Sequence, residues 1–174
     1  MHLIISCSLN KKSKSRIMAK HAHSLHTENS KYIDLKDFDM PLCDGNSCYD
    51  HPVTKELKNI IEGASSILIS GPIYNYDLNA AVKNLLELTG QSWNNKLVGF
   101  ICAAGGKGSY MSPMSFMNSL ILDYRCMIIP RYVYADSTCF DDKGQFNEEI
   151  KNRIEEVVNS SIKLHHALST IKND

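Results

Sequence analysis

The fold is decided by residues 66–77, which read Ser-Ile-Leu-Ile-Ser-Gly-Pro-Ile-Tyr-Asn-Tyr-Asp. A short run of apolar residues, here residues 66–70, is typical of a parallel strand that helices cover on both faces. Glycine and proline then end the run. Residues 78–89 follow with apolar side chains at helical spacing, with Asp77 as the expected cap and Gly90 as the expected end. A buried strand followed by an amphipathic helix is the repeating unit of an open α/β sheet.

On both sides of this stretch, further apolar runs alternate with amphipathic segments. The other predicted strands occupy residues 3–6, 32–35, 97–103 and 127–134, and the other predicted helices occupy residues 15–27, 53–62, 113–123 and 147–171. Strict alternation without repeats or a linker predicts a single doubly wound α/β domain over residues 1–174. Right-handed crossovers favour a flavodoxin-like three-layer sandwich, with helices on both faces of a five-stranded parallel sheet in the order 2-1-3-4-5.

The composition is that of a soluble globular chain. Apolar residues make up 43% and charged residues 22% of the 174 residues, which is close to the average for such proteins. Basic and acidic residues are equal at 19 each, so no net charge attracts nucleic acid or an anionic membrane, and neither is an expected partner. Because no run approaches the roughly 20 apolar residues of a membrane span and no signal-peptide pattern is present, we expect a cytoplasmic protein.

Neither the cysteines nor the histidines form a familiar metal motif. Cys43 and Cys48 are separated by Asp-Gly-Asn-Ser, which matches no common zinc spacing, so a metal or redox role for this pair is the less favoured interpretation. Of His21, His23 and His26, only the last two share a helix face, and no carboxylate completes a ligand set. A solvated helix face is the favoured interpretation, and no metal is predicted.

The loop after the first strand, residues 6–16, has the composition of an anion site. In a doubly wound sheet the ligand lies beyond the carboxyl ends of the strands. This loop carries several serines and enters a helix directly, and no acidic residue precedes Glu28. Hydroxyls, free amides at a helix start and nearby cations suit a phosphate monoester. The cations are Lys11, Lys12, Lys14, Arg16 and Lys20. Taken alone, the loop could equally be a surface turn, and it lacks the glycine motifs of Rossmann dinucleotide sites and P-loop NTPases.

The loops after the third and fourth strands suit a flat ring. Pro72 with Tyr74 and Tyr76 makes a stiff apolar lip, although the tyrosines could instead seal the end of the sheet. Residues 102–110 contain three glycines and few side chains besides Lys107, so backbone amides can approach a planar ligand closely. A phosphate cup, an apolar lip and a wall of backbone donors together describe a mononucleotide with a large flat base, and FMN fits all three.

Several segments resemble the NADPH-dependent FMN reductases, in order along the chain. They are residues 8–15 (Ser-Leu-Asn-Lys-Lys-Ser-Lys-Ser), 71–75 (Gly-Pro-Ile-Tyr-Asn), 80–84 (Ala-Ala-Val-Lys-Asn) and 104–108 (Ala-Gly-Gly-Lys-Gly), with weaker matches at 40–42 and 140–144. The resemblance implies noncovalent FMN, reduction by NADPH or NADH, and a homodimer or homotetramer. It also implies ping-pong hydride transfer through flavin N5 to a flavin, quinone, azo or metal-ion acceptor. No catalytic side chain is expected, because the cofactor carries the chemistry.

The same resemblance assigns the site residues. The serines of the first loop are expected at the FMN phosphate, residues 72–75 at the flavin ring edge and ribityl chain, and residues 104–107 at the pyrimidine end. The expected cofactor-binding set is Ser8, Asn10, Ser13, Lys14, Ser15, Pro72, Ile73, Tyr74, Asn75, Ala104, Gly105, Gly106 and Lys107. The chain departs from the family at Cys7 for a usual glycine, Asn10 for a usual arginine and Ile73 for a usual glutamate. Lys12 or Lys14 is the expected substitute for the lost arginine.

Other classes of protein fit the sequence less well. Cys7 ends the first predicted strand, as in low-molecular-weight phosphatases and arsenate reductases, but their C-x5-R cradle would need arginine where Ser13 stands. A receiver domain needs paired acids at that strand end, and none occurs there. The alternative function is a flavodoxin-type electron carrier without efficient NAD(P)H oxidation, although such carriers are typically strongly acidic and this chain is neutral. Trp93 could contact a ring across a dimer interface or belong to the core.

Overall fold

The computed structural model describes residues 1–26 and 29–171. Its sheet is built on parallel strands in the order β2-β1-β3-β5-β6. These are β1 (His2–Ser6), β2 (Ser30–Asp34), β3 (Ser66–Tyr74), β5 (Leu97–Ala103) and β6 (Met127–Ile128). Since β5 is the fourth predicted strand and β6 begins the fifth, the predicted order 2-1-3-4-5 is confirmed along this path.

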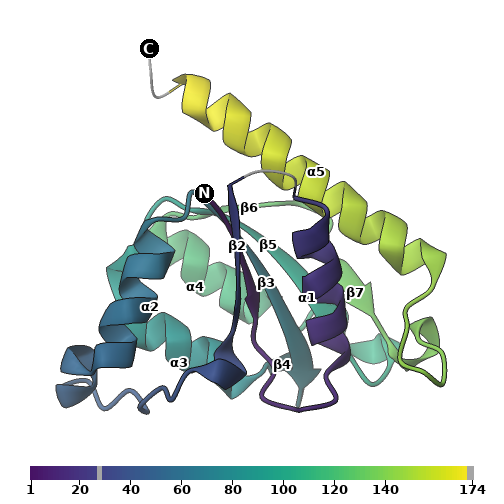
Figure 1. Ribbon diagram of the computed structural model, residues 1–174, viewed down its shortest axis with the longest axis horizontal. Coiled ribbons are helices and arrows are strands. Elements are labelled where there is room, and N and C mark those ends of the chain that lie inside the picture. Colours follow the sequence, from purple (N-terminus) through teal and green to yellow (C-terminus); the bar gives the residue numbers. More distant parts are fainter. Residues whose placement is uncertain (27–28, 172–174) are drawn as a thin grey trace.

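Helices cover both faces of the sheet, which confirms the predicted three-layer fold (Figure 1). On one face, α1 (Lys14–Ser24) and α5 (Glu148–Ile171) pack through residues such as Met18 and Ile154. On the other face, α2 (Pro52–Glu62), α3 (Ala80–Thr89) and α4 (Met114–Tyr124) pack through residues such as Leu57, Val82 and Phe116. Alternate residues of the central strands point to the two faces, so the strands are buried on both sides.

The predicted strand 127–134 is wrong as a single element. It is divided into β6 and β7 (Val133–Ala135), which pair with the beginning and the end of β5 respectively. Between them, Pro130 has no amide to donate to the sheet, and Arg131 has a φ of 58°, which is outside the extended region. Both pieces nevertheless lie beside β5, in the position predicted for the fifth strand.

A short hairpin at the end of β3 was not predicted. β4 (Asp77–Leu78) pairs antiparallel with Ile73 and Tyr74. Together with the division of the fifth predicted strand, it brings the sheet of the described residues to seven strands rather than five. The two residues of its turn, Asn75 and Tyr76, have φ values of 49° and 66°, as a two-residue hairpin turn of type I′ requires. The prediction of Asp77 as a helix cap is therefore wrong, because Asp77 belongs to this hairpin.

The ends of the helices mostly follow local chemistry. Ser13 caps α1, and Gly90, with a φ of 49°, ends α3 as predicted. Pro113 directly precedes α4 rather than lying in its first turn. The predicted helix 15–27 ends earlier, at Ser24, and position 27 lies outside the described residues. Within the described part of the chain, no helix is both long and apolar enough to cross a membrane.

Candidate functional site

The three predicted loops leave the sheet at the same edge, which is the lower edge in Figure 1. In the sheet register, Ser6 lies opposite Ser70 and Pro72 lies opposite Ala103. The Cys7 amide then donates to the Ser70 carbonyl at 2.8 Å, which fixes where the first loop departs. The structure thus brings residues 8–15, 72–75 and 104–107 to neighbouring positions.

The first loop fixes its hydroxyls at the start of α1. Ser8, Ser13 and Ser15 are all buried. The Ser13 hydroxyl accepts from the Arg16 amide at 3.1 Å and lies 2.9 Å from the Ser15 hydroxyl. The first amides of a helix have no partner within it and carry partial positive charge. This arrangement favours an anion at the loop.

Arg16 holds the same loop from inside. Its guanidinium is buried and pairs through Nε with the carboxylate of Asp34, at the end of β2. Its Nη2 donates to the carbonyl of Ser8 at 2.6 Å, and its Nη1 donates to those of Asn10 at 2.5 Å and Lys11 at 3.3 Å. The expectation that Arg16 is one of the cations available to an anion is therefore wrong. Arg16 shapes the loop instead.

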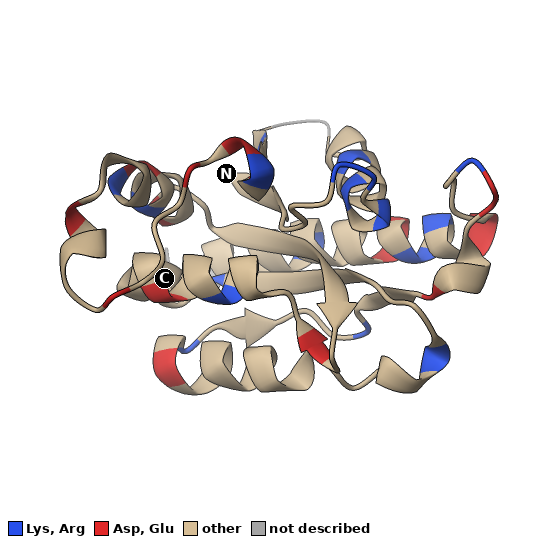
Figure 2. Ribbon diagram, turned by 90° about the horizontal axis from the view of Figure 1, so that it is seen from below, with Lys and Arg blue, Asp and Glu red and all other residues tan. Residues whose placement is uncertain are grey.

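The lysines gather on the outer side of the loop. Lys11, Lys12 and Lys20 are exposed, and Lys14 lies with its ammonium 4.5 Å from the centre of the Phe140 ring. Together with Lys143 of the opposite loop they line a cavity of about 480 Å³. Figure 2, which looks onto this edge of the sheet, shows the basic segment at the start of α1. Positive charge is therefore concentrated at the first loop despite the neutral chain.

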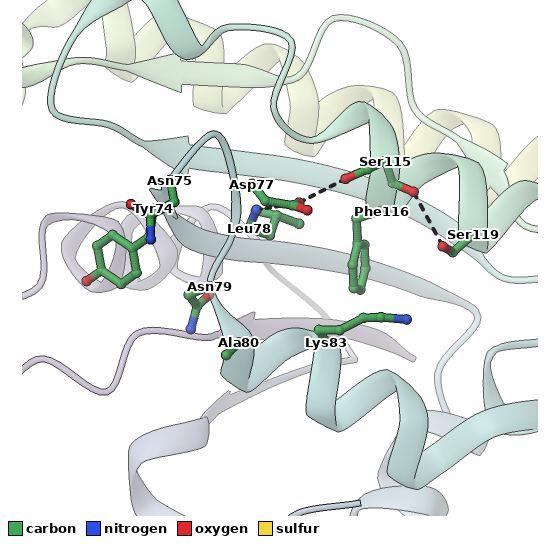
Figure 3. A pocket seen from close by; sticks show the side chains of 10 residues that line it. All are labelled: Tyr74, Asn75, Asp77, Leu78, Asn79, Ala80, Lys83, Ser115, Phe116 and Ser119. Carbon is green, nitrogen blue, oxygen red and sulfur yellow. Dashed lines mark hydrogen bonds between the residues drawn. The ribbon is translucent and has the colours of Figure 1, made fainter.

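The second loop divides into a buried and an exposed part. Pro72 and Ile73 are buried, and the Ile73 side chain belongs to the core, so only its backbone can face a ligand. Tyr74 and Asn75 are exposed and line a cavity of about 480 Å³ between the hairpin, α3 and α4 (Figure 3). On the far wall of this cavity, the Ser115 hydroxyl donates to Asp77 at 2.9 Å. The tyrosine of the predicted lip stands free instead of sealing the sheet.

Asn79 joins the first and second loops, and the sequence analysis missed it. It is buried at the start of α3, and its Nδ2 donates to the Cys7 carbonyl at 2.7 Å. Its Oδ1 has no hydrogen-bond partner among the described residues. A Cβ on Gly71 would lie 3.2 Å from that oxygen, which is a crowded distance. An asparagine directly before an amphipathic helix was the available signal.

The third loop is anchored to β7 at its first residue and exposed at its glycines. The Ala104 amide donates to the Ala135 carbonyl at 2.9 Å. Beyond it, residues 105–108 are exposed, and a Cβ added to any of the three glycines would meet nothing within 4 Å. The Tyr134 hydroxyl, from β7, donates to the Gly106 carbonyl. This tyrosine was also missed, and it gives an otherwise bare loop a fixed support.

Burial excludes the thiolate chemistry that Cys7 suggested. The Cys7 side chain is fully buried, and burial raises the pKa of its thiol well above the ordinary value. A phosphatase of that class needs an accessible thiolate.

Trp93 is also fully buried, and its indole donates to the Thr89 hydroxyl at 2.8 Å, so it belongs to the core.

The histidines form no metal site either. His26 is buried rather than solvated, which corrects the sequence interpretation of this helix face. Its ring packs on His2 at 4.8 Å, while His21 packs on Phe146 at 5.3 Å. Among residues 1–26 and 29–171, no group of His, Cys, Asp or Glu is placed to hold a metal ion.

Comparison with known proteins agrees with this geometry. Residues 2–140 match the family model of the NADPH-dependent FMN reductases. The chain is 25% identical over 142 residues to an NAD(P)H-dependent FAD/FMN reductase of Geobacillus thermodenitrificans, covering 79% of this chain and 76% of that protein. It is 27% identical over 158 residues to an NADPH azoreductase of a Bacillus species, covering 90% and 87% respectively.

A solved structure has the same fold. It is the flavoenzyme NAD(P)H:(acceptor) oxidoreductase FerB of Paracoccus denitrificans, which superposes with a TM-score of 0.74 at 20% identity over 94% of this chain and 97% of that one. The family match covers most of the chain. The chain therefore belongs to the NADPH-dependent FMN reductases, a family of oxidoreductases that combine FMN with NAD(P)H.

Proposed function

We propose that the three loops hold one FMN noncovalently and that the protein uses NADPH or NADH to reduce a small-molecule acceptor. The observation that carries this proposal is the convergence, at one sheet edge, of a buried serine cluster at a helix start and an open glycine loop. A phosphate and a flat ring need these two surfaces at once. No separate nucleotide domain is required, because hydride donor and acceptor can use the same crevice in turn.

The donor set of the loops fits the parts of FMN. Ser8, Ser13 and Ser15, with the first amides of α1, suit the phosphate, and the nearby Asn10 and Lys14 add a polar group and a positive charge. Residues 72–75 would border the ring and the ribityl chain. The unpaired Oδ1 of Asn79 would accept a hydrogen bond from a hydroxyl of the ribityl chain. Ala104, Gly105, Gly106 and Lys107 would border the pyrimidine end.

The chain's own residues position charge rather than move protons. FMN held by these loops would supply the redox chemistry, which is hydride acceptance at N5 from NAD(P)H and ping-pong delivery of the electrons to a second substrate. Backbone amides at Gly105 and Gly106, with Lys107 beside them, would stabilise negative charge at the pyrimidine end. The Tyr134 hydroxyl keeps this loop in place. No side-chain acid or base is required.

The acceptor and the assembly follow by analogy. One relative is named an azoreductase and another an FAD/FMN reductase, which supports an azo compound or a free flavin as acceptor, with quinones and metal ions as further candidates. Exposed tyrosines and methionines around the third loop, such as Tyr110 and Met111, support burial against a second copy in a dimer or tetramer. We also propose a cytoplasmic location.

Anaerobic reduction tests the proposal. The purified protein is loaded with FMN, freed of unbound flavin, and titrated with NADPH and, separately, with NADH. We expect one equivalent of at least one nicotinamide to bleach the visible flavin absorbance, and an azo dye or quinone to restore it. A protein that retains FMN but is bleached by neither nicotinamide would be an electron carrier, and a protein that retains no FMN would refute the assigned site.

A further inference from the structure

Cys43 and Cys48 form a thiol pair that the reductase activity does not use. They lie at the two ends of a tight loop between β2 and α2. The Cys48 thiol donates to the Cys43 sulfur, and the two Sγ atoms are 3.9 Å apart. A disulfide needs about 2.05 Å between sulfurs. A displacement of about 2 Å between the two sulfurs would therefore join them.

The loop is already shaped for closure. Asp44 accepts hydrogen bonds from the amides of Asn46 at 2.8 Å and Cys48 at 3.1 Å, and from the Ser47 hydroxyl at 2.7 Å. Gly45 takes a φ of 71°, which a side chain would strain. These contacts hold both ends of the loop together while the thiols are reduced, so little chain entropy remains to be lost on closure.

The loop is also anchored to the body of the protein. The Cys43 amide donates to Oδ1 of Asn84 at 2.9 Å, and Nδ2 of the same residue donates to the Pro41 carbonyl at 2.9 Å. Asn84 belongs to α3, so the position of Cys43 is fixed against a helix. The Tyr49 hydroxyl lies 3.7 Å from the Cys43 sulfur on the outer side.

Accessibility separates Cys43 from the core cysteines. Cys7, Cys102 and Cys126 are buried, and burial raises the pKa of Cys102 to about 12 and that of Cys126 to about 11. Cys43 is partly exposed, whereas Cys48 is buried behind it, and burial together with its hydrogen bond to Asp44 raises the pKa of Cys48 too. An outer thiol backed by an inner one is the arrangement in which an oxidant reaches the first sulfur and the second resolves the product.

We infer that Cys43 and Cys48 are a reversible oxidation site that reacts with hydroperoxides to form an intramolecular disulfide. Hydrogen peroxide transfers one oxygen to the Cys43 thiol, which gives a sulfenic acid and one water. The Cys48 sulfur then attacks the Cys43 sulfur, the S–O bond breaks, and the second water leaves. In sum, two thiols and one peroxide give one disulfide and two waters. A small dithiol reverses the reaction by becoming a disulfide itself. The reaction involves no flavin, so it goes beyond the proposed function.

The test is to count thiols in the full chain before and after oxidation. The reduced protein is treated with one equivalent of hydrogen peroxide, unfolded, alkylated and weighed. We expect the six alkylatable thiols to fall to four, with a peptide that links Cys43 to Cys48, and dithiothreitol to restore all six. Circular dichroism confirms that each variant is folded. Unchanged alkylation of Cys43 and Cys48, or a link from either to another cysteine, would overturn the inference.

Single variants separate the two roles. In Cys48→Ser the reaction stops at the Cys43 sulfenic acid, which dimedone traps, and in Cys43→Ser every remaining thiol stays alkylatable. Cys139→Ser is the matched control, because Cys139 is also partly exposed but lies outside the pair, and it should still form the disulfide. Equal dimedone labelling of Cys48→Ser and Cys43→Ser would contradict the assignment of Cys43 as the residue that is attacked.

Discussion

Polar side chains at the two edges of the sheet have different hydrogen-bond and packing partners. Where the strands begin, His2, His26 and His165 pack ring against ring, with the ring centres of His2 4.8 and 5.0 Å from the other two. Ser161 donates to Ser66 at 3.1 Å, and Nδ1 of His2 lies 2.6 Å from the same Ser66 hydroxyl. Polar side chains at this edge contact one another, and Nε2 of the buried His26 has no hydrogen-bond partner among the described residues.

Where the strands end, the polar groups belong to the loops, as buried serine hydroxyls in one and exposed backbone in another. Serine hydroxyls and helix amides surround one loop, and exposed glycines form another. The side chains that support this edge, Arg16, Asn79 and Tyr134, donate to backbone carbonyls of the loops. At the first edge, which we call the closed edge, side chains thus contact one another. At the second, which we call the open edge, side chains fix the backbone of the loops. We expect the closed edge to contribute stability and the open edge to bind the cofactor.

The largest expected effect comes from removing the support of the open edge. Arg16→Ala leaves Asp34 as a buried unpaired carboxylate and frees three loop carbonyls. Breaking a buried ion pair costs about 3–5 kcal/mol, and we expect a loss of that size in the free energy of unfolding, together with loss of FMN retention. Urea denaturation measures it. Lys12→Ala, an exposed neighbour, should change stability by less than about 0.5 kcal/mol. Equal stability of the two variants would contradict the role of Arg16.

The closed edge should be the acid-sensitive one. Burial, reinforced by His26 and His165, lowers the pKa of His2 from 6.5 to about 4. Below the unfolded pKa the unfolded chain takes up a proton that the folded chain refuses, so stability is lost as the pH falls from about 6.5 toward 4. Because His2 is only partly buried, we expect about 1–2 kcal/mol rather than the full value of the shift.

Two measurements check this pH dependence. The His2 ring should titrate near pH 4 by NMR in the folded protein. His2→Asn should flatten the fall in unfolding free energy over that range, since the ionisable group is gone. A wild-type stability that rises on acidification from neutral pH would contradict the assignment.

A single serine separates stability from binding at the open edge. Ser13→Ala removes the cap of α1 and should cost about 1 kcal/mol of stability. Ser13→Asp retains a capping oxygen but adds a negative charge where a phosphate is proposed to lie. We therefore expect Ser13→Asp to be as stable as wild type and to bind FMN at least about tenfold more weakly. Thermal unfolding with and without FMN measures both effects, and undiminished FMN binding by Ser13→Asp would remove Ser13 from the phosphate site.

The smallest expected effect concerns the glycine loop. Tyr134→Phe removes one hydrogen bond, to the Gly106 carbonyl, and should cost about 0.5–1 kcal/mol. FMN should dissociate faster from this variant, because the loop loses its fixed support. Tyr76→Phe, at the exposed hairpin turn, is the control and should match wild type. Stopped-flow dilution of the FMN complex compares the dissociation rates, and identical rates for the two variants would show that the support is dispensable.

The sequence was sufficient for the fold wherever one local rule decided the element. Long apolar runs predicted the central strands, because a strand buried on both faces carries apolar residues at every position instead of alternating apolar and polar ones. The sequence was not sufficient where unusual backbone dihedral angles determined the element. Arg131 and Tyr76 adopt positive φ, which residue type alone does not reveal, and β4 is too short to leave a periodic signal.

For the candidate site, the sequence located the loops but not their supports. The loops could be found because strand ends share one edge of a parallel sheet. Asn79 and Tyr134 were missed because their partners lie far away in sequence. Asn79 bonds to Cys7, 72 residues earlier, and Tyr134 bonds to Gly106, 28 residues earlier. Arg16 was visible as a charge, but its burial depends on Asp34 from another strand.

A matched pair of serine variants tests most directly whether the open edge is the FMN site. Ser15→Ala and Ser161→Ala each remove one buried hydroxyl, the first at the open edge and the second at the closed edge. FMN is titrated into wild type and both variants, and the quenching of its fluorescence gives the Kd. We predict that Ser15→Ala binds about tenfold more weakly, as expected for one lost hydrogen bond to a charged group, and that Ser161→Ala matches wild type. Equal affinity for the two variants, or no FMN binding by wild type, would contradict the account.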